Sequence, residues 1–136
     1  MTAGFQPGDL VILAARPGMG KTALALNMGM NAALNRNTPC TVAIFSLEMP
    51  TIQLVMRMLS SEAQVGSESL KTGFLKDYEI DRLTETVDRV KDVSIFIDDT
   101  AGLSVMECRS KCRRLATDES LPPLGLVIVD LSLIHI

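Results

Sequence analysis

Short apolar runs alternate along the chain with longer segments in which apolar residues recur every three or four positions. Turn residues or charged residues bound each short run, and this pattern predicts a strand. The first two runs are almost entirely apolar, which is typical of strands that are buried on both faces. The four predicted strands cover residues 10–14, 41–46, 94–98 and 126–130.

Helical patterns separate these strands. The segment from Lys21 to about Asn35 is apolar almost all round, so we expect a largely buried helix there. A short turn or helix at 68–72 ends at Gly73. Three further helices are expected to turn apolar stripes inward: Ile52, Val55, Met56 and Leu59 after Pro50-Thr51; Ile80, Leu83, Val87 and Val90 within 77–91; Val105, Cys108, Cys112 and Leu115 within 104–116.

The alternation of strands and helices predicts the α/β class, with a mostly parallel sheet flanked by helices. The chain has 136 residues, which is enough for one domain with its own core. A net charge of −3 argues against a chain-wide basic surface that grips nucleic acid by charge alone. No apolar stretch is long enough to span a membrane and no signal peptide is recognisable, so we expect a cytoplasmic protein. Three cysteines, an odd number, also fit a reducing compartment.

A glycine-rich loop lies between the first predicted strand and the first helix. Gly18 and Gly20 allow the backbone to approach a phosphate closely, and the N–H groups at the following helix start attract anions. Lys21 adds a mobile charge for the terminal phosphates, and Thr22 offers a hydroxyl to Mg²⁺. The strict pattern has Gly where this chain has Ala15, and a small residue serves there. The sequence therefore predicts an ATP-binding P-loop at Ala15, Arg16, Pro17, Gly18, Met19, Gly20, Lys21 and Thr22.

Three strand ends carry acids that could serve hydrolysis, which needs a carboxylate to order Mg²⁺ and a water aimed at the γ-phosphate. These acids are Glu48, the pair Asp98-Asp99, and Asp130. The pattern alone does not rank Asp98-Asp99 against Asp130. An acid can also end a strand simply because it meets solvent or caps the next helix.

Several segments together resemble the ATPase domain of the bacterial replicative DNA helicases, the DnaB family. The similarity extends in order over nearly the whole chain to Asp130, and the loop combined with Ser46-Leu47-Glu48-Met49 is its most specific part. The matching segments are residues 4–10, 15–22, 45–49, 97–100, 112–115 and 127–130.

This resemblance implies a RecA-like P-loop NTPase core that assembles into a homo-hexameric ring. It implies ATP hydrolysis with Mg²⁺, 5'–3' translocation on single-stranded DNA and duplex unwinding in DNA replication, with primase and a helicase loader as partners. Glu48 then matches the position at which the family has the residue that polarises the attacking water. Asp130 matches the family's Walker B aspartate, which implies that it holds Mg²⁺ together with Thr22. Asp98 and Asp99 become lesser candidates, with a structural or ring-contact role.

By the same resemblance, residues 1–130 are the N-terminal portion of the ATPase domain. The family's N-terminal domain, DNA-binding loops and arginine finger are expected outside this chain, so the chain alone should be nearly inactive. The tail 131–136 departs from the family, and we interpret it as non-native, with a fourth strand that simply runs on as the alternative. Two alternatives remain: a recombinase or clock-type ATPase on the same fold, and a nucleotide-binding ring module without catalysis.

Two features of the predicted helix 104–116 also suggest chemistry. Cys108 and Cys112 are four residues apart, but without a second ligand pair we interpret them as buried thiols and not as a metal clip. A basic group could face DNA or a neighbouring subunit, although a solvated helix face is the more common outcome. This group consists of Arg109, Lys111, Arg113 and Arg114.

Overall fold

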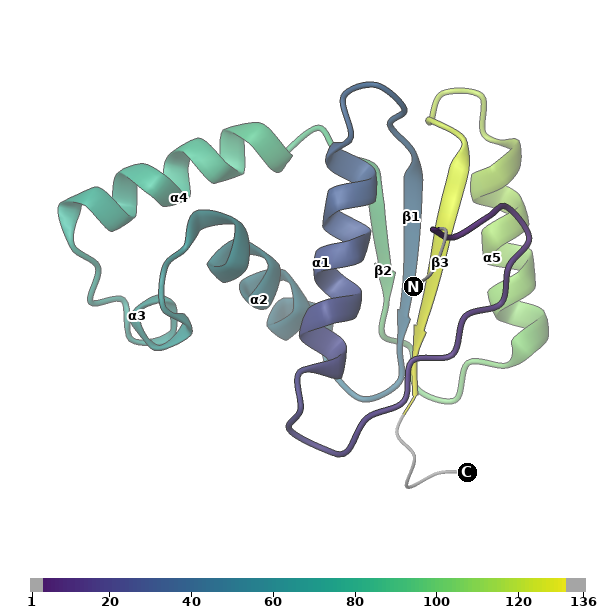
Figure 1. Cartoon of the computed structure of the whole chain (residues 1–136), viewed down its shortest axis with the longest axis horizontal. Helices are drawn as coiled ribbons and strands as arrows, with labels where there is room; N and C mark the ends of the chain where they lie inside the picture. Colours follow the sequence, from purple (N-terminus) through teal and green to yellow (C-terminus); the bar gives the residue numbers. More distant parts are fainter. Residues whose placement is uncertain (1–3, 132–136) are drawn as a thin grey trace.

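Three parallel strands in the order β2-β1-β3 form the centre of the structure, a computed structural model that describes residues 4–131 (Figure 1). The central strand β1 spans Thr41–Ser46, with β2 (Ile95–Asp98) on one side and β3 (Leu124–Asp130) on the other. The whole of β1 is buried. The parallel sheet and these three strands confirm the prediction of an α/β fold. Of the tail predicted to be non-native, residues 132–136 lie outside the described residues.

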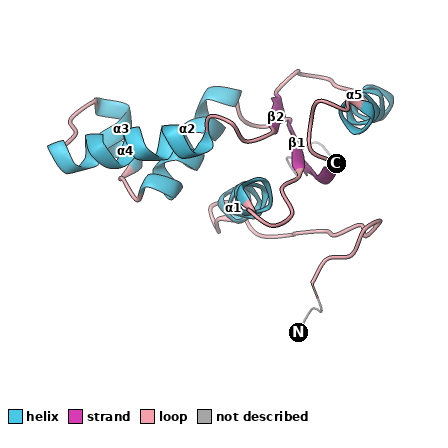
Figure 2. Ribbon diagram, turned by 90° about the horizontal axis from the view of Figure 1, so that it is seen from above, coloured by secondary structure: helices cyan, strands magenta, loops and turns pink. Residues whose placement is uncertain are grey.

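Helices α1 (Lys21–Leu34) and α5 (Val105–Thr117) lie on opposite faces of the sheet (Figure 2). Helix α1 buries Leu26 and Met30 against Val42 and Ile44 of the central strand. It approaches the sheet closely at Gly29, where a Cβ would lie 3.1 Å from Ile128 Cδ1. Only the side of α1 that faces the sheet is buried, so the expectation of an all-round buried helix is wrong. Among the described residues the sheet and α2 cover part of α1, and much of its remaining surface is open.

Helices α2 (Thr51–Ala63), α3 (Ser67–Thr72) and α4 (Asp77–Val90) extend to one side of the sheet (Figures 1 and 2). In α2 the buried apolar side chains are Leu54, Met58 and Ala63, and Ile52 is exposed, contrary to its predicted place on the inner face. Of the described helices, none is both long and apolar enough to cross a membrane.

The apolar stripe predicted to face inward on α4 is only partly buried. Ile80 and Val87 are exposed, whereas the buried residues of α4 are Glu79 and Thr86. This difference arises because α4 packs mainly against α2, and its buried residues Glu79 and Thr86 lie on the side of that contact. The prediction fails here because periodicity identifies an apolar face but not the element that covers it.

Helix α5 begins with a capping box, in which Ser104 Oγ accepts from Glu107 N and Ser104 N donates to the Glu107 carboxylate. Cys108 and Cys112 are only half-buried, less than the buried thiols that were predicted. Val105 was expected to face inward but is 83% exposed. Val105 is the first residue of the helix, and side chains on a helix tilt toward its N-terminus. The Val105 side chain therefore lies beyond the turn that packs on the sheet.

The run Leu10–Ala14 is not a strand, and its predicted burial on both faces is wrong. Leu10 is 89% and Ile12 82% exposed, and the segment passes as a loop into α1 (Figure 1). A fully apolar strand is stable only where neighbouring strands pair with it and helices cover both of its faces. Within residues 4–131, no strand pairs with this run and no helix covers it, so its apolar side chains are exposed.

Candidate nucleotide-binding site

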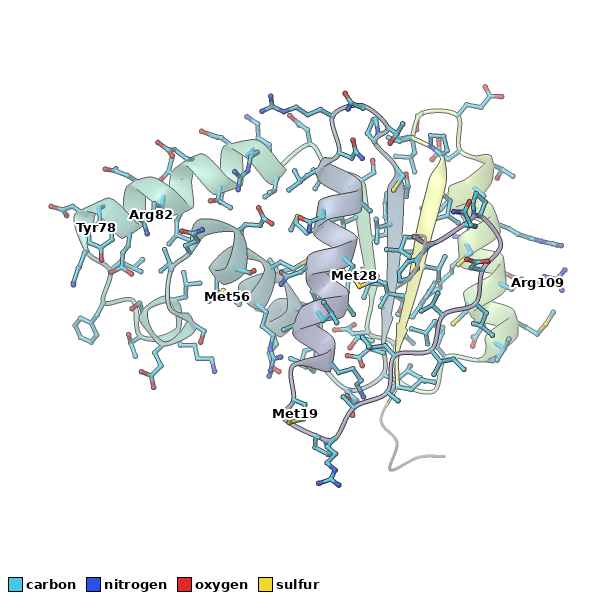
Figure 3. All side chains as sticks on the ribbon, viewed as in Figure 1. Met19, Met28, Met56, Tyr78, Arg82 and Arg109 are labelled. Carbon is cyan, nitrogen blue, oxygen red and sulfur yellow. The ribbon has the colours of Figure 1, made fainter. Side chains whose placement is uncertain are left out.

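The glycine-rich loop turns directly into the start of α1. Gly18 and Gly20 have φ values of 77° and 85°, in the left-handed region that glycine adopts without strain. Gly20 is the N-cap residue of α1, and since it has no side chain it leaves the first N–H groups of the helix uncapped. Met19 projects from the tip of the loop (Figure 3). The loop therefore presents free N–H donors and the positive end of a helix dipole at one surface, which is what an anionic phosphate requires.

Thr22 and Asp130 meet across the fold although 108 residues separate them. The Thr22 hydroxyl lies 3.1 Å from Asp130 Oδ2 and donates a hydrogen bond to it. Thr22 lies in the first turn of α1, and Asp130 is the buried last residue of β3. The parallel sheet brings these two predicted metal-binding residues together, because α1 starts at the edge where β3 ends.

Glu48 lies in the exposed loop between β1 and α2, beside the end of β3. Ser46, the last residue of β1, is paired in register with Asp130. Leu47 N donates to the Asp130 carbonyl at 3.1 Å, and Met49 N donates to Ser46 Oγ at 3.1 Å. The backbone on both sides of Glu48 is therefore fixed to the strand ends, which places Glu48 at the same edge of the sheet as Asp130.

Asp98 and Asp99 are engaged with other parts of the fold. Asp98 forms an ion pair with Lys111 of α5 and accepts from Thr100 N at 2.9 Å. The hydrogen bond from Lys111 is the main reason that the pKa of Asp98 is lowered to about 2. Asp99 Oδ2 accepts from Thr51 N at 2.8 Å, and this bond lowers the pKa of Asp99. Both carboxylates thus serve contacts within the protein, whereas Asp130 meets the hydroxyl of the glycine-rich loop.

The pair Thr22 and Asp130 fits a hard divalent cation. Both offer oxygen donors, and Mg²⁺ at a phosphate site is held by one or two protein ligands, with phosphate oxygens and waters in its other positions. Within residues 4–131, no group of three or more His, Cys, Asp or Glu side chains forms a dedicated metal cage. The arrangement therefore suits a metal that arrives with a phosphate ligand.

Sequence reasoning assigned no role to two residues that hold this edge together. Ser46 binds the backbone of Met49, and Thr51 N reaches across to Asp99. A hydroxyl at the end of an otherwise apolar strand was the available signal for Ser46. Lys111 belonged to the predicted basic group but pairs with Asp98, while Arg109 of the same helix points away from the sheet (Figure 3).

A model of the DnaB-like helicase C-terminal domain matches residues 1–135. The chain belongs to this family. Among curated relatives, "Replicative DNA helicase DnaC" of Bacillus subtilis (strain 168) is 48% identical over 130 residues, and "Replicative DNA helicase DnaB" of Geobacillus stearothermophilus is 45% identical over 130 residues. In both cases the match covers 96% of this chain and 28% of the relative. The chain thus spans little more than a quarter of the length of these DnaB-like relatives.

Solved structures support the same family. A chain whose title describes it as an ATPase domain superposes with a TM-score of 0.74 at 28% identity, over 86% of this chain and 40% of that one. A second solved structure, "The Structure Of A DnaB-Like Replicative Helicase And Its Interactions With Primase", superposes with a TM-score of 0.68 at 28% identity. This match covers 85% of the present chain and 27% of the solved one. The fold is that of the RecA-like ATPase domains of DnaB-like helicases, and the predicted family resemblance is confirmed.

Proposed function

We propose that this chain supplies the phosphate-binding and Mg²⁺-ordering part of an ATP-driven replicative DNA helicase. The observation that carries the proposal is the contact of the Thr22 hydroxyl with Asp130, 3.1 Å long, which joins the glycine-rich loop to the end of β3. The naming of the curated relatives as replicative DNA helicases supports duplex unwinding as the task. The protein would act in the bacterial cytoplasm, where DNA is replicated.

In this proposal the N–H groups of the loop 15–20 and the start of α1 bind the phosphates of ATP. Lys21 contacts the β- and γ-phosphates as a point charge. Thr22 and Asp130 hold Mg²⁺, which neutralises charge that builds up on the phosphate oxygens. Glu48 accepts a hydrogen bond from the attacking water, aligns it with the γ-phosphorus and polarises it as its oxygen attacks.

The wider assembly is proposed on the same basis. The family resemblance supports a homo-hexameric ring that moves 5'–3' along single-stranded DNA. One solved relative has primase in its title, which supports primase as a partner here, and a helicase loader is proposed by resemblance alone. The exposed position of residues 16–20 leaves room for ATP and for a residue from a neighbouring subunit to approach the same phosphates.

Strand displacement by the full-length protein tests this function. On a forked duplex with a fluorescent strand, we expect displacement that requires both ATP and Mg²⁺, and ATP hydrolysis that single-stranded DNA accelerates. A blunt duplex without a single-stranded tail is the control and should remain paired, because the motor needs a strand to load on. Hydrolysis that is indifferent to DNA, without displacement, would contradict the helicase assignment.

The metal requirement distinguishes Asp130 from Asp99. We expect Asp130→Asn to raise the Mg²⁺ concentration needed for half-maximal hydrolysis, because a neutral amide binds a divalent cation less well than a carboxylate. Asp99→Asn should change this concentration far less, since Asp99 binds the backbone of α2. Hydrolysis rates measured against Mg²⁺ at saturating ATP give both values, and the reverse order would place the metal at the end of β2.

A further inference from the structure

The loop Leu47–Pro50 is tied to the rest of the sheet at three points. Leu47 N donates to the Asp130 carbonyl on β3, and Met49 N donates to Ser46 Oγ at the end of β1. The third tie lies where the loop enters α2: Thr51 N donates to Asp99 Oδ2 at 2.8 Å, across 48 residues of sequence. Glu48 thus lies in a short loop that all three strand ends hold.

Helix α2 depends on this distant carboxylate because it has no cap of its own. Its N-cap residue is Pro50, whose side chain makes no capping hydrogen bond. The first N–H groups of a helix need acceptors, and a carboxylate at that end also interacts favourably with the helix dipole. Asp99 supplies this acceptor from the segment that follows β2.

Asp99 is itself held in place by its neighbour. Asp98 is fixed by its ion pair with Lys111 on α5 and by the hydrogen bond from Thr100 N. The two adjacent carboxylates therefore connect α5, the end of β2 and the start of α2. Pro50, with φ −63° and ψ 150°, is the rigid link between the start of α2 and Met49-Glu48, because the proline ring restricts φ.

We propose that Asp99 is a positioning residue for Glu48: by capping α2 from the end of β2, it fixes the loop that aims the Glu48 carboxylate. The proposal rests on the proposed function, since it assigns Asp99 a part in aligning the water that Glu48 polarises. It gives Asp99 a role that differs from metal binding. Asp99 then serves the start of α2, whereas Asp130 is the residue proposed to bind the metal.

Loss of the cap should act on the chemical step and not on nucleotide binding. Without an acceptor at residue 99, the first turn of α2 loses a tertiary tie and Glu48 becomes less well aligned, while the loop 15–20 and α1 are untouched. Small misplacements of a catalytic group cost on the order of 10- to 100-fold in rate. We expect Asp99→Ala to lower kcat in that range and to leave the KM for ATP nearly unchanged.

The test compares four single variants of the full-length protein by steady-state ATP hydrolysis: Asp99→Ala, Asp99→Asn, Asp118→Ala and Glu48→Gln. Asn keeps an oxygen that caps a helix as well as Asp does, so Asp99→Asn should restore most of kcat. Asp118→Ala is the matched control, because Asp118 also accepts a backbone hydrogen bond, from Ser120 N in an exposed turn, and should leave kcat unchanged. The double variant with Glu48→Gln and Asp99→Ala should be no slower than Glu48→Gln alone, because Asp99 acts through Glu48.

Thermal unfolding of each variant accompanies the kinetics. If Asp99→Ala does not fold, Asp99→Glu replaces it, since this change keeps the charge, moves the carboxylate by one methylene and should show the same loss of kcat. Equal kcat in wild type and Asp99→Ala overturns the proposal, and so does a further fall of turnover in the double variant. Either result leaves the proposed function intact as long as Lys21→Ala abolishes hydrolysis, whereas full hydrolysis by Lys21→Ala would refute the proposed function itself.

Discussion

Lys21→Ala in the full-length protein is expected to lose most of its affinity for ATP and all measurable turnover. Lys21 is the first residue of α1 and directly follows Gly20, so its side chain starts at the end of the helix where the phosphates are proposed to bind. Removing it takes away the mobile positive charge at the β- and γ-phosphates, which bear most of the negative charge of ATP. Binding of a fluorescent ATP analogue and release of phosphate measure the two effects separately.

Lys71→Ala is the matched control for this variant. It removes the same charge from an exposed position in the last turn of α3 and leaves the net charge of the two proteins equal. Affinity and turnover of the control should stay at the wild-type level. Hydrolysis by Lys21→Ala at the rate of the control would remove the phosphate-binding claim.

Glu48→Gln is expected to separate binding from chemistry. The substitution keeps the size of the side chain and loses the charge that orients and polarises water, while the loop 15–20, Lys21 and Thr22 remain. Nucleotide should therefore bind with nearly wild-type affinity, and turnover should fall by about 10²–10⁴-fold, the usual contribution of a positioned acid or base.

The comparison variant is Glu119→Gln, which neutralises an exposed glutamate after α5. It should change neither the affinity for nucleotide nor the turnover. Affinity comes from equilibrium titration and turnover from single-turnover hydrolysis, so that product release does not mask the chemical step. A parallel loss of affinity and turnover would show that Glu48 is structural and that another group activates the water.

The bounds of a strand or helix are predicted well where the described residues include the elements that pack against it. Strand β1 was predicted at 41–46 and spans Thr41–Ser46, because the sheet covers both of its edges and helices cover both of its faces. The start of α1 at Lys21 was also predicted, since Gly20 must adopt a backbone that side chains disfavour and a helix can begin only after it. The start of α1 is thus set by the local backbone at Gly20, whereas β1 is predicted well because its neighbours are all present.

Burial was predicted less well because it depends on contacts that are distant in sequence. The run Leu10–Ala14 is as apolar as β1 but lies exposed, and Ile80 and Val87 of α4 face outward because α2 covers the other side of that helix. Apolar periodicity gives the face of an element but not its partner. The same limitation applies to the acids: pattern left Asp98, Asp99 and Asp130 equal, and only the folded sheet shows that Asp130 meets Thr22 while Asp98 and Asp99 bind Lys111 and Thr51.

Residues 15–22 are proposed to bind the triphosphate, with Thr22 and Asp130 beside the metal. A crystal structure of the full-length protein with Mg²⁺ and a non-hydrolysable ATP analogue tests this binding mode. We expect phosphate oxygens within hydrogen-bond distance of the N–H groups of residues 18–22 and of Lys21 Nζ, with the metal next to Thr22 and Asp130 and with Glu48 facing the γ-phosphate. A triphosphate bound elsewhere on the protein, or a metal held by Asp98 and Asp99 in place of Asp130, would contradict it.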